Sequence, residues 1–222
     1  MKYHHVGFPA RRTVGQDVFL RHFCPPPPAV EENPFRLRWK AKSDLPNLDI
    51  IRRIAHVAFE VEDIGATIKD KIILTEPIYN SKGEVEVFIE IDEAPILLIN
   101  APECNRQIGA EGSRFKYHSF WIPTNLERKD DIYLPDLKMH VYDPKNEFRV
   151  GWVRYDEDAP YPRVVKNIPH IAFEVEDIEH EIAGEKVIIT PNSPAPGLIV
   201  AFIEFMGVPV EFLQIDRNLI EI

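Results

Sequence analysis

The sequence has little cysteine, no long apolar run and a deficit of positive charge, and each shortage excludes a class of protein. Its 222 residues include two cysteines, Cys24 and Cys104, which lack the C-x-x-C spacing of metal-binding cysteines. We therefore expect no disulfide framework and interpret both as ordinary thiols. No apolar run approaches the roughly 18 residues of a membrane-spanning helix, and Met1–Arg12 has no apolar segment typical of a secretion signal. We expect a soluble, cytoplasmic protein.

The charge balance and the motifs that are missing narrow the range of partners. The 36 acidic residues outnumber the 26 basic ones, which gives a net charge of −10. Because affinity for nucleic acid comes mainly from Lys and Arg neutralising phosphates, this balance argues against nucleic acid, and it also disfavours an anionic membrane surface. No glycine-rich phosphate loop or nucleophile elbow is present. The expected partner is a small molecule, and the sequence leaves the oligomeric state open.

Two segments of the chain are nearly the same. Ile54–Ile64 reads IAHVAFEVEDI, and 114 residues later Ile168–Ile178 reads IPHIAFEVEDI. Such self-similarity indicates an internal duplication, with repeat 1 over residues 1–112 and repeat 2 over residues 113–222. With 45% hydrophobic residues the chain can bury one large core or two small ones. The copies can be compared with each other, so a chemically active residue present in one and absent from the other marks where function has been divided.

Each copy opens with a short segment of strand character, Tyr3–Phe8 or Tyr117–Ile122, that ends at a proline. An irregular stretch follows, which in copy one includes the proline run after Cys24 that cannot lie inside a helix. The second half of each copy predicts a strand, a short helix with Asp63 or Asp177 as N-cap, and three further strands, the last two joined by a hairpin turn. The predicted helices span residues 64–71 and 178–185, and the hairpin turns span residues 92–95 and 206–209.

The order strand, helix, strand, strand, strand resembles the module of the vicinal oxygen chelate superfamily. The strand openings His5-Val6-Gly7 and His170-Ile171-Ala172 and the terminal segment Val208–Leu213 resemble it as well. This superfamily includes glyoxalase I, methylmalonyl-CoA epimerase, extradiol dioxygenases, and fosfomycin- and bleomycin-resistance proteins. The resemblance covers most of the chain, best over residues 54–100 and 168–215. It implies an α+β fold in which duplicated βαβββ modules form two barrel-like halves, each curled around a pocket.

The resemblance also implies where metal ligands stand, early in the first strand and late in the last strand of each module. Carried over residue by residue, copy one has no carboxylate at these positions, and copy two has one imidazole and one carboxylate. The four positions are His5, Arg38, His56 and Leu97 in copy one, and Ser119, Gly151, His170 and Glu211 in copy two. The offset between Arg38 and Gly151 is one residue shorter than the offset between the members of the other three pairs. Neither copy alone retains a full ligand set.

Pairing the modules crosswise between the copies would bring His5, His170 and Glu211 together as two histidines and a carboxylate. Such a set leaves coordination positions open and suits one divalent ion, either Fe, Mn, Zn or Ni. Sequential pairing within each copy would instead place His5 near His56 and Glu211 beside Ser119. We expect the crosswise arrangement, whose second pocket could not hold a metal. That second pocket would contain Ser119, Gly151, His56 and Leu97.

These residues predict a metal-dependent enzyme that acts on a small oxygen-bearing organic substrate as a lyase or isomerase. A bound metal would chelate neighbouring oxygens or stabilise an enolate. Glu211 would serve as the catalytic base, and Arg38 would bind a substrate carboxylate or phosphate through its planar fork. An Fe(II)-dependent dioxygenase is a second alternative, because the three-ligand set also resembles the dioxygenases of the superfamily.

A metal-free alternative stays open as well. Bleomycin-resistance-like members bind a ligand without metal, and the loss of ligands from both copies is what such a binder, or a metal-free catalyst, would show. His56 and His170 could then be hydrogen-bonded core residues, and Arg38 a solvated strand residue. Four aromatic residues would either line the cavity or pack in the core, namely Phe8, Trp39, Trp121 and Trp152.

Overall fold

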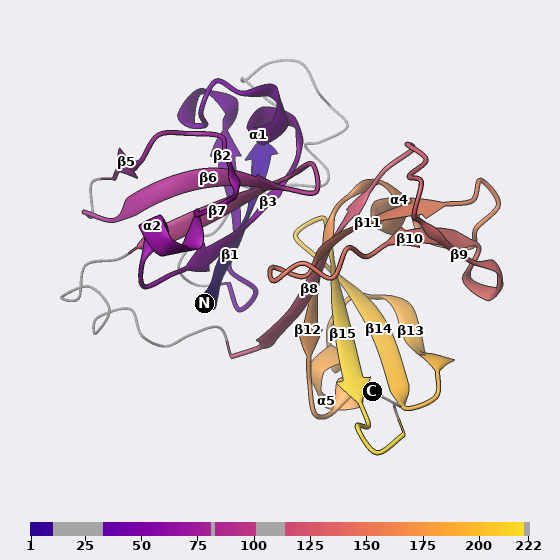
Figure 1. Cartoon of the computed structure of the whole chain (residues 1–222). Helices are drawn as coiled ribbons and strands as arrows, with labels where there is room; N and C mark the ends of the chain where they lie inside the picture. Colours follow the sequence, from indigo (N-terminus) through magenta and orange to yellow (C-terminus); the bar gives the residue numbers. More distant parts are fainter. Residues whose placement is uncertain (11–32, 81–82, 101–113, 220–222) are drawn as a thin grey trace, which may run out of the picture. The chain divides into compact units, whose positions relative to one another are not determined.

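The computed structural model describes residues 1–10, 33–80, 83–100 and 114–219, and the chain divides into two compact units (Figure 1). The described residues up to Arg114 belong to unit 1, and those from Phe115 onward belong to unit 2. Cys24, Cys104 and the proline run after Cys24 lie outside the described residues. No helix in the described part of the chain is long and apolar enough to cross a membrane.

Unit 1 is built on one mixed sheet of seven strands, drawn from indigo to magenta in Figure 1. Its strands, in spatial order, are β2 (Leu37–Ala41), β1 (Lys2–Ala10), β3 (His56–Glu60), β7 (Ala94–Asn100), β6 (Val85–Ile91) and β4 (Ile72–Ile73), with β5 (Ile78–Tyr79) also paired to β6. Among its described residues the helices are the 3-10 turn η2 (Lys42–Asp44), α1 (Asp49–Arg53) and α2 (Ile64–Thr67).

Unit 2 repeats this plan on a sheet of eight strands. The spatial order is β13 (Val187–Ala195), β14 (Leu198–Phe205), β15 (Val208–Ile215), β12 (His170–Glu174), β8 (Lys116–Pro123), β11 (Val150–Tyr155), β10 (Met139–Tyr142) and β9 (Ile132–Leu134). Its helices are the 3-10 turn η3 (Pro135–Leu137), α4 (Arg163–Asn167) and α5 (Ile178–Ile182).

The predicted βαβββ order is confirmed in both units, as β3–α2–β4–β6–β7 in unit 1 and β12–α5–β13–β14–β15 in unit 2. The N-caps are also confirmed, because an Oδ1 atom of Asp63 accepts a hydrogen bond from the Ala66 amide at 3.0 Å and Asp177 accepts one from the His180 amide at 3.1 Å. Both helices are shorter than predicted. After α5 the left-handed Gly184 follows the C-cap Ala183 and stops the helix.

The predicted hairpin turns between the last two strands have the same backbone conformation in both units. Asp92 and Glu93 join β6 to β7 with φ of 49° and 65°, and Met206 and Gly207 join β14 to β15 with φ of 53° and 79°. Two consecutive left-handed residues are the pattern of a type I′ turn, whose twist matches that of the strands it connects. The turns therefore fix the register of β7 and β15, the strands that carry Leu97 and Glu211.

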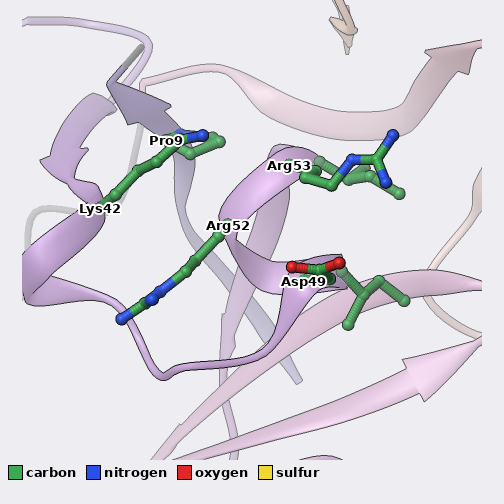
Figure 2. A pocket seen from close by; sticks show the side chains of 7 residues that line it. Pro9, Lys42, Asp49, Arg52 and Arg53 are labelled. Carbon is green, nitrogen blue, oxygen red and sulfur yellow. The ribbon is translucent and has the colours of Figure 1, made fainter. Parts of the chain in front are cut away.

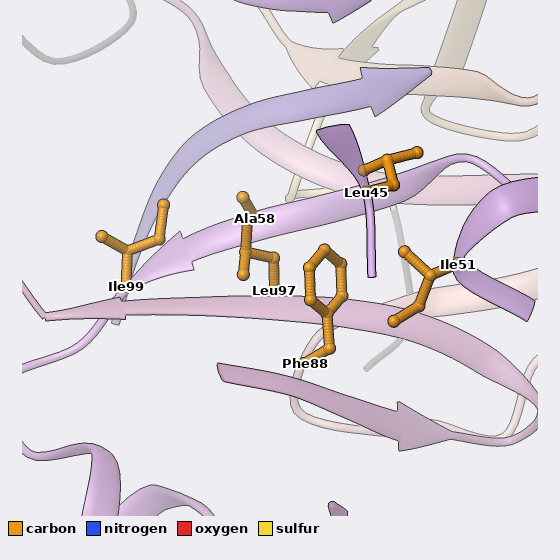
Figure 3. Close-up of a cluster of buried hydrophobic side chains, with 6 residues drawn as sticks. All are labelled: Leu45, Ile51, Ala58, Phe88, Leu97 and Ile99. Atoms are coloured by element: carbon orange, nitrogen blue, oxygen red, sulfur yellow. The ribbon is translucent and has the colours of Figure 1, made fainter. Parts of the chain in front are cut away.

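A cluster of buried apolar side chains packs between the unit 1 sheet and α1 (Figure 3). It consists of Leu45, Ile51, Ala58, Phe88, Leu97 and Ile99. Side chains on a strand alternate between the two faces, so Leu97 and Ile99 on β7 reach the same side of the sheet as Ala58 on β3. Burial of each large apolar side chain contributes roughly 1.5–3 kcal/mol. The cluster holds one end of the face on which His5 and His56 lie.

The modules pair within each copy. β1 is antiparallel to β3 and parallel to β2, all in unit 1, and β8 is antiparallel to β12 and parallel to β11, all in unit 2. The crosswise pairing that we expected is therefore not the pairing of these sheets. The sequence could not distinguish the two arrangements, because β3 and β12 carry nearly the same residues and either would suit β1 by pattern alone.

Candidate functional site

The sheet registers align the four positions that the sequence analysis carried over. Ala58 lies between His5 and Leu97 on neighbouring strands, and its counterpart Ala172 lies between Ser119 and Glu211. Arg38 pairs with Gly7, and Gly151 pairs with Trp121 at the position equivalent to Gly7, so the one-residue slip in the alignment is real. The equivalent pairs are His5 with Ser119, Arg38 with Gly151, His56 with His170, and Leu97 with Glu211.

In unit 2 the structure brings His170 and Glu211 together. The Nε2 atom of His170 lies 3.4 Å from Oε2 of Glu211, and both residues are buried, at 4% and 9% exposure. Phe202 packs edge-on against the imidazole with ring centroids 5.2 Å apart. Burial of a carboxylate in an otherwise apolar strand is costly without a partner, and His170 supplies that partner. The Nδ1 atom of His170 has no hydrogen-bond partner among the described residues.

The surroundings of this pair are polar on one side and aromatic on the other. The Oγ atom of Ser119 accepts a hydrogen bond from Trp121 Nε1 at 3.0 Å and lies 3.0 Å from Nδ1 of His118. Burial lowers the pKa of His118, and the charge of Glu211 opposes that shift. Burial, with smaller contributions from Glu211 and Tyr161, raises the pKa of Tyr155. The Tyr155 hydroxyl is therefore protonated at neutral pH.

In unit 1 the equivalent region holds two imidazoles and no carboxylate. His5 and His56 are almost fully buried, with ring centroids 5.8 Å apart, and Nδ1 of His5 lies 2.7 Å from Nδ1 of His4. Neither ring nitrogen of His56 has a hydrogen-bond partner among the described residues. Burial, reinforced by Lys40 and Arg38, lowers the pKa of His56 to about 3, so its imidazole is neutral at pH 7.

Burial also holds the pKa of His5 well below its usual range, and the nearby positive charge of Arg38 adds to that effect. Burial lowers the pKa of Arg38 too, while Glu84 and Glu86 oppose the shift. The two unit 1 histidines therefore have the cations Arg38 and Lys40 as neighbours, whereas their counterpart in unit 2 has the carboxyl group of Glu211.

In each unit one of two paired strand positions holds a glycine and the other a large residue, and the two units have them in opposite order. A Cβ atom added to Gly7 would lie 2.2 Å from Cε1 of His56, so glycine is what lets that imidazole lie on β1. In unit 2 the position of Gly7 is taken by Trp121, and the small residue is Gly151, where an added Cβ would lie 2.4 Å from Cζ3 of the indole. The indole of Trp121 thus covers the strand position that Arg38 occupies in unit 1.

Of the four aromatic residues considered for a cavity, Trp121 alone shares the face of the candidate site. Phe8 and Trp39 stack on each other, with ring centroids 5.8 Å apart, one position along from Gly7 and Arg38 and therefore on the opposite face. Trp152 is likewise one position from Gly151 and lies against the guanidinium of Arg128. These three residues pack in the sheet instead of lining the site.

Sequence reasoning missed Lys40 and Tyr155. Lys40 contributes to the charge felt by His56, and Tyr155 is coupled to Glu211. Strand alternation could have indicated both, because Lys40 lies two residues after Arg38 and Tyr155 lies four residues after Gly151, which places each pair on one face.

Comparison with known proteins finds no matching family model and no curated protein with a matching sequence. Among solved structures, a mutant of 4-hydroxymandelate synthase from Streptomyces coelicolor is 12% identical and has a TM-score of 0.42, with 72% of this chain and 69% of that chain covered. Methylmalonyl-CoA epimerase from Mycobacterium tuberculosis is 12% identical with a TM-score of 0.23, covering 78% of this chain and 95% of that one. A hypothetical protein from Bacillus halodurans is 17% identical with a TM-score of 0.22, covering 75% and 96%.

These identities and TM-scores carry no argument about the reaction. The fold rests on the structure itself, in which a βαβββ module and the antiparallel pairing of β1 with β3 recur as β12–β15 and the pairing of β8 with β12. The chain has an α+β fold built from duplicated βαβββ modules.

The donor set of unit 2 fits a metal in part. Two ligands of one ion, each about 2.0–2.2 Å from it, lie roughly 3 Å apart, and the distance between His170 Nε2 and Glu211 Oε2 is compatible with that geometry. No group of three His, Cys, Asp or Glu side chains in the described ranges could hold an ion. The predicted third ligand, His5, lies in unit 1, so the trio of His5, His170 and Glu211 stays a prediction.

Proposed function

We propose that the chain is an enzyme that transfers protons within a small oxygen-bearing organic molecule, as a lyase or isomerase, at the His170–Glu211 pair of unit 2. The observation that carries the proposal is the buried carboxylate of Glu211 at 3.4 Å from His170 Nε2, at a strand position where unit 1 has Leu97. A buried carboxylate and imidazole in contact are suited to general acid–base catalysis. A core position without such a role is filled at lower cost by an apolar residue, and the other copy has Leu97 there.

In this reaction the Glu211 carboxylate takes a proton from the substrate carbon next to a carbonyl group. The C–H bond breaks and its electron pair forms a carbon–carbon double bond while the π pair of the carbonyl group moves onto its oxygen. The proton resides on a carboxylate oxygen of Glu211. Return of the proton to the other face or to a neighbouring atom completes an isomerisation, and departure of a group from the adjacent carbon completes an elimination. His170 positions the carboxylate and stabilises its negative charge before the transfer.

A divalent metal is part of the proposal, with His170 and Glu211 as two ligands and His5 as the predicted third. When bound, such an ion supplies polarisation of the substrate carbonyl. We expect about one divalent ion per chain, of Fe, Mn, Zn or Ni, in elemental analysis of the purified protein, because three ligands suffice for one such site. His170→Ala or Glu211→Ala should remove it.

The His5→Ala variant tests the third ligand. Loss of the ion from this variant, to the extent seen with His170→Ala, would support the trio. Retention of the ion would assign the site to unit 2 alone. Two ions per chain, or retention of the ion by Glu211→Ala, would contradict the assignment.

The catalytic proposal is tested by hydrogen exchange of candidate substrates in D2O. The full-length protein is incubated with a panel of 2-oxo acids, α-hydroxy ketones and acyl thioesters, before and after chelation and reloading with Mn(II), and loss of the α-proton signal is followed by proton NMR. We expect exchange with at least one class, and a decrease of at least about 100-fold in Glu211→Gln, the typical contribution of a general base.

His56→Ala is the matched control, because His56 has the same strand context as His170 without the carboxylate. It should retain exchange. Exchange that is equally fast in Glu211→Gln would overturn the proposal. Absence of exchange from every class, together with saturable binding of one of these compounds, would favour the metal-free binding protein instead.

A further inference from the structure

A pocket of about 630 Å3 opens in unit 1 beside the end of β1 and the helix α1 (Figure 2). Its lining residues are Pro9, Lys42, Asp49, Ile50, Arg52, Arg53 and Ile54. Three of them are cations and one is an anion. Arg52 is held by Asn47 and by the carbonyl of Leu45, whereas Lys42 and Arg53 form no ion pair with any residue that the structure describes. The pocket therefore carries an excess of positive charge.

Pro9 connects the pocket to the sheet face that carries His56. It lies two residues along β1 from Gly7, so the two residues lie on the same face of the sheet. On β2, Arg38 pairs with Gly7 and Lys40 pairs with Pro9, and Lys42 follows at the pocket. Arg38 and Lys40 thus lie on the face that carries His56, and Lys42 follows them in the turn after β2. The negative charges of Glu84 and Glu86 also act on Arg38.

Two groups on this face have polar atoms without partners. His56 is 0% exposed, and both of its ring nitrogens lack a hydrogen-bond partner among the described residues. The Nε atom of Arg38 is also buried and unpartnered. Buried polar atoms in native proteins nearly always have a partner, and those that do not call for a ligand or another explanation. In unit 2 the carboxylate of Glu211 contacts Nε2 of His170. Unit 1 has Leu97 at the position of Glu211.

We propose that this face of unit 1 binds an oxyanion, the carboxylate or phosphate group of a small molecule, between Arg38, Lys40 and Lys42, with His56 on its inner side. The planar guanidinium of Arg38 matches two oxygens of such a group, and the ammonium groups supply compact positive charge. The neutral imidazole can donate one N–H, and the absence of a carboxylate at Leu97 removes the repulsion that Glu211 would exert. The site uses neither His170 nor Glu211, so the test of anion binding is independent of the test of the proposed reaction.

Isothermal titration of the full-length protein with sodium phosphate and with sodium succinate, at constant ionic strength set by sodium chloride, tests the proposal. We expect saturable binding of at least one anion, weakened about tenfold or more in Arg38→Gln and in Lys40→Gln because each removes a charge-assisted contact. Arg38→Lys keeps the charge and loses the planar fork, so it should bind with intermediate affinity. Comparison of the two anions distinguishes a phosphate site from a carboxylate site.

Lys129→Gln, an exposed substitution in unit 2, is the control for a general effect of charge. It should bind like the unaltered protein. Circular dichroism of each variant establishes that it is folded, and Lys40→Gln decides the question if Arg38→Gln does not fold. Absence of saturable binding in the unaltered protein, or equal affinity in Lys40→Gln and Lys129→Gln, would overturn the proposal.

Discussion

His56 and His170 show how one residue type in one strand context acquires two different properties. Both begin the strand that pairs antiparallel with the first strand of their unit, and each packs edge-on against a phenylalanine. His170 contacts a carboxylate, whereas His56 lies over Gly7 near two cations and makes no hydrogen bond with a described residue. The difference arises from residues on neighbouring strands and not from the histidines themselves. Protonation of His56 in the folded protein is therefore unfavourable.

This environment predicts that acid destabilises the protein through His56. Its pKa is about 3 when folded and about 6.5 when unfolded, so the unfolded chain binds more protons between these values. The contribution of His56 is complete above pH 6.5 and declines as the pH falls toward 3. It should cost about 1.4 kcal/mol per pH unit, or roughly 2 kcal/mol between pH 6.5 and 5. Urea unfolding of His56→Gln should lack this part of the pH dependence.

His180→Gln provides the comparison for this measurement. His180 is exposed, so its substitution controls for the removal of a histidine as such. An unchanged slope in His56→Gln would contradict the assignment.

At the scale of the elements, the approach of β1 to the His56 side chain depends on a single glycine. Gly7→Ala would place a methyl group 2.2 Å from the imidazole, which must then move or push β1 away from β3. We expect a loss of about 1–3 kcal/mol in the free energy of unfolding, the usual cost of overpacking. Thermal and urea unfolding followed by circular dichroism would measure it.

Gly65→Ala is the comparison substitution at a less crowded glycine. An added Cβ on Gly65 would lie 3.3 Å from Asp63 Oδ1, the N-cap oxygen, and alanine favours the helix α2. Because these effects oppose each other and the contact is longer than at Gly7, this variant should lose less stability than Gly7→Ala. A Gly7→Ala variant that is no less stable than Gly65→Ala would show that the strands adapt more easily than the contact distance indicates.

The elements also show which parts of the structure were predictable. The N-caps at Asp63 and Asp177 and the two hairpin turns depend on neighbouring residues, and all four were predicted from the sequence. The alignment of Arg38 with Gly151 followed from the duplication and agrees with the sheet registers. The partner of β1 could not be predicted, because strand pairing is a long-range property and both copies offer the same pattern. Lys40 and Tyr155 were missed because only the ligand positions of the module were considered.

At the scale of the whole molecule, each unit has its own sheet and its own buried clusters. All eight strands of the unit 2 sheet come from residues 116–215. We therefore expect residues 115–222, expressed alone, to unfold cooperatively in urea, with the β-sheet signal in circular dichroism that the intact protein shows. A fragment without a cooperative transition would show that the unit depends on the rest of the chain.

The same fragment also bears on the metal. If His170 and Glu211 need His5, the folded fragment should bind the ion far more weakly than the intact protein. Equal affinity of the fragment and the intact protein would exclude a role for His5.

The exchange of large and small residues between neighbouring strands restricts the routes by which two initially identical copies could diverge. If the ancestor resembled unit 2, Gly151→Arg as the first change would make the arginine collide with the indole of Trp121. Trp121→Gly as the first change would instead leave a void, which the arginine of a later Gly151→Arg change could fill. The two substitutions are therefore strongly non-additive, and one order of mutation is easier than the other. Once the pair has changed together, reversal of either member alone is disfavoured. Steric constraints from the earlier substitutions then keep the two copies different, in addition to any selection for function.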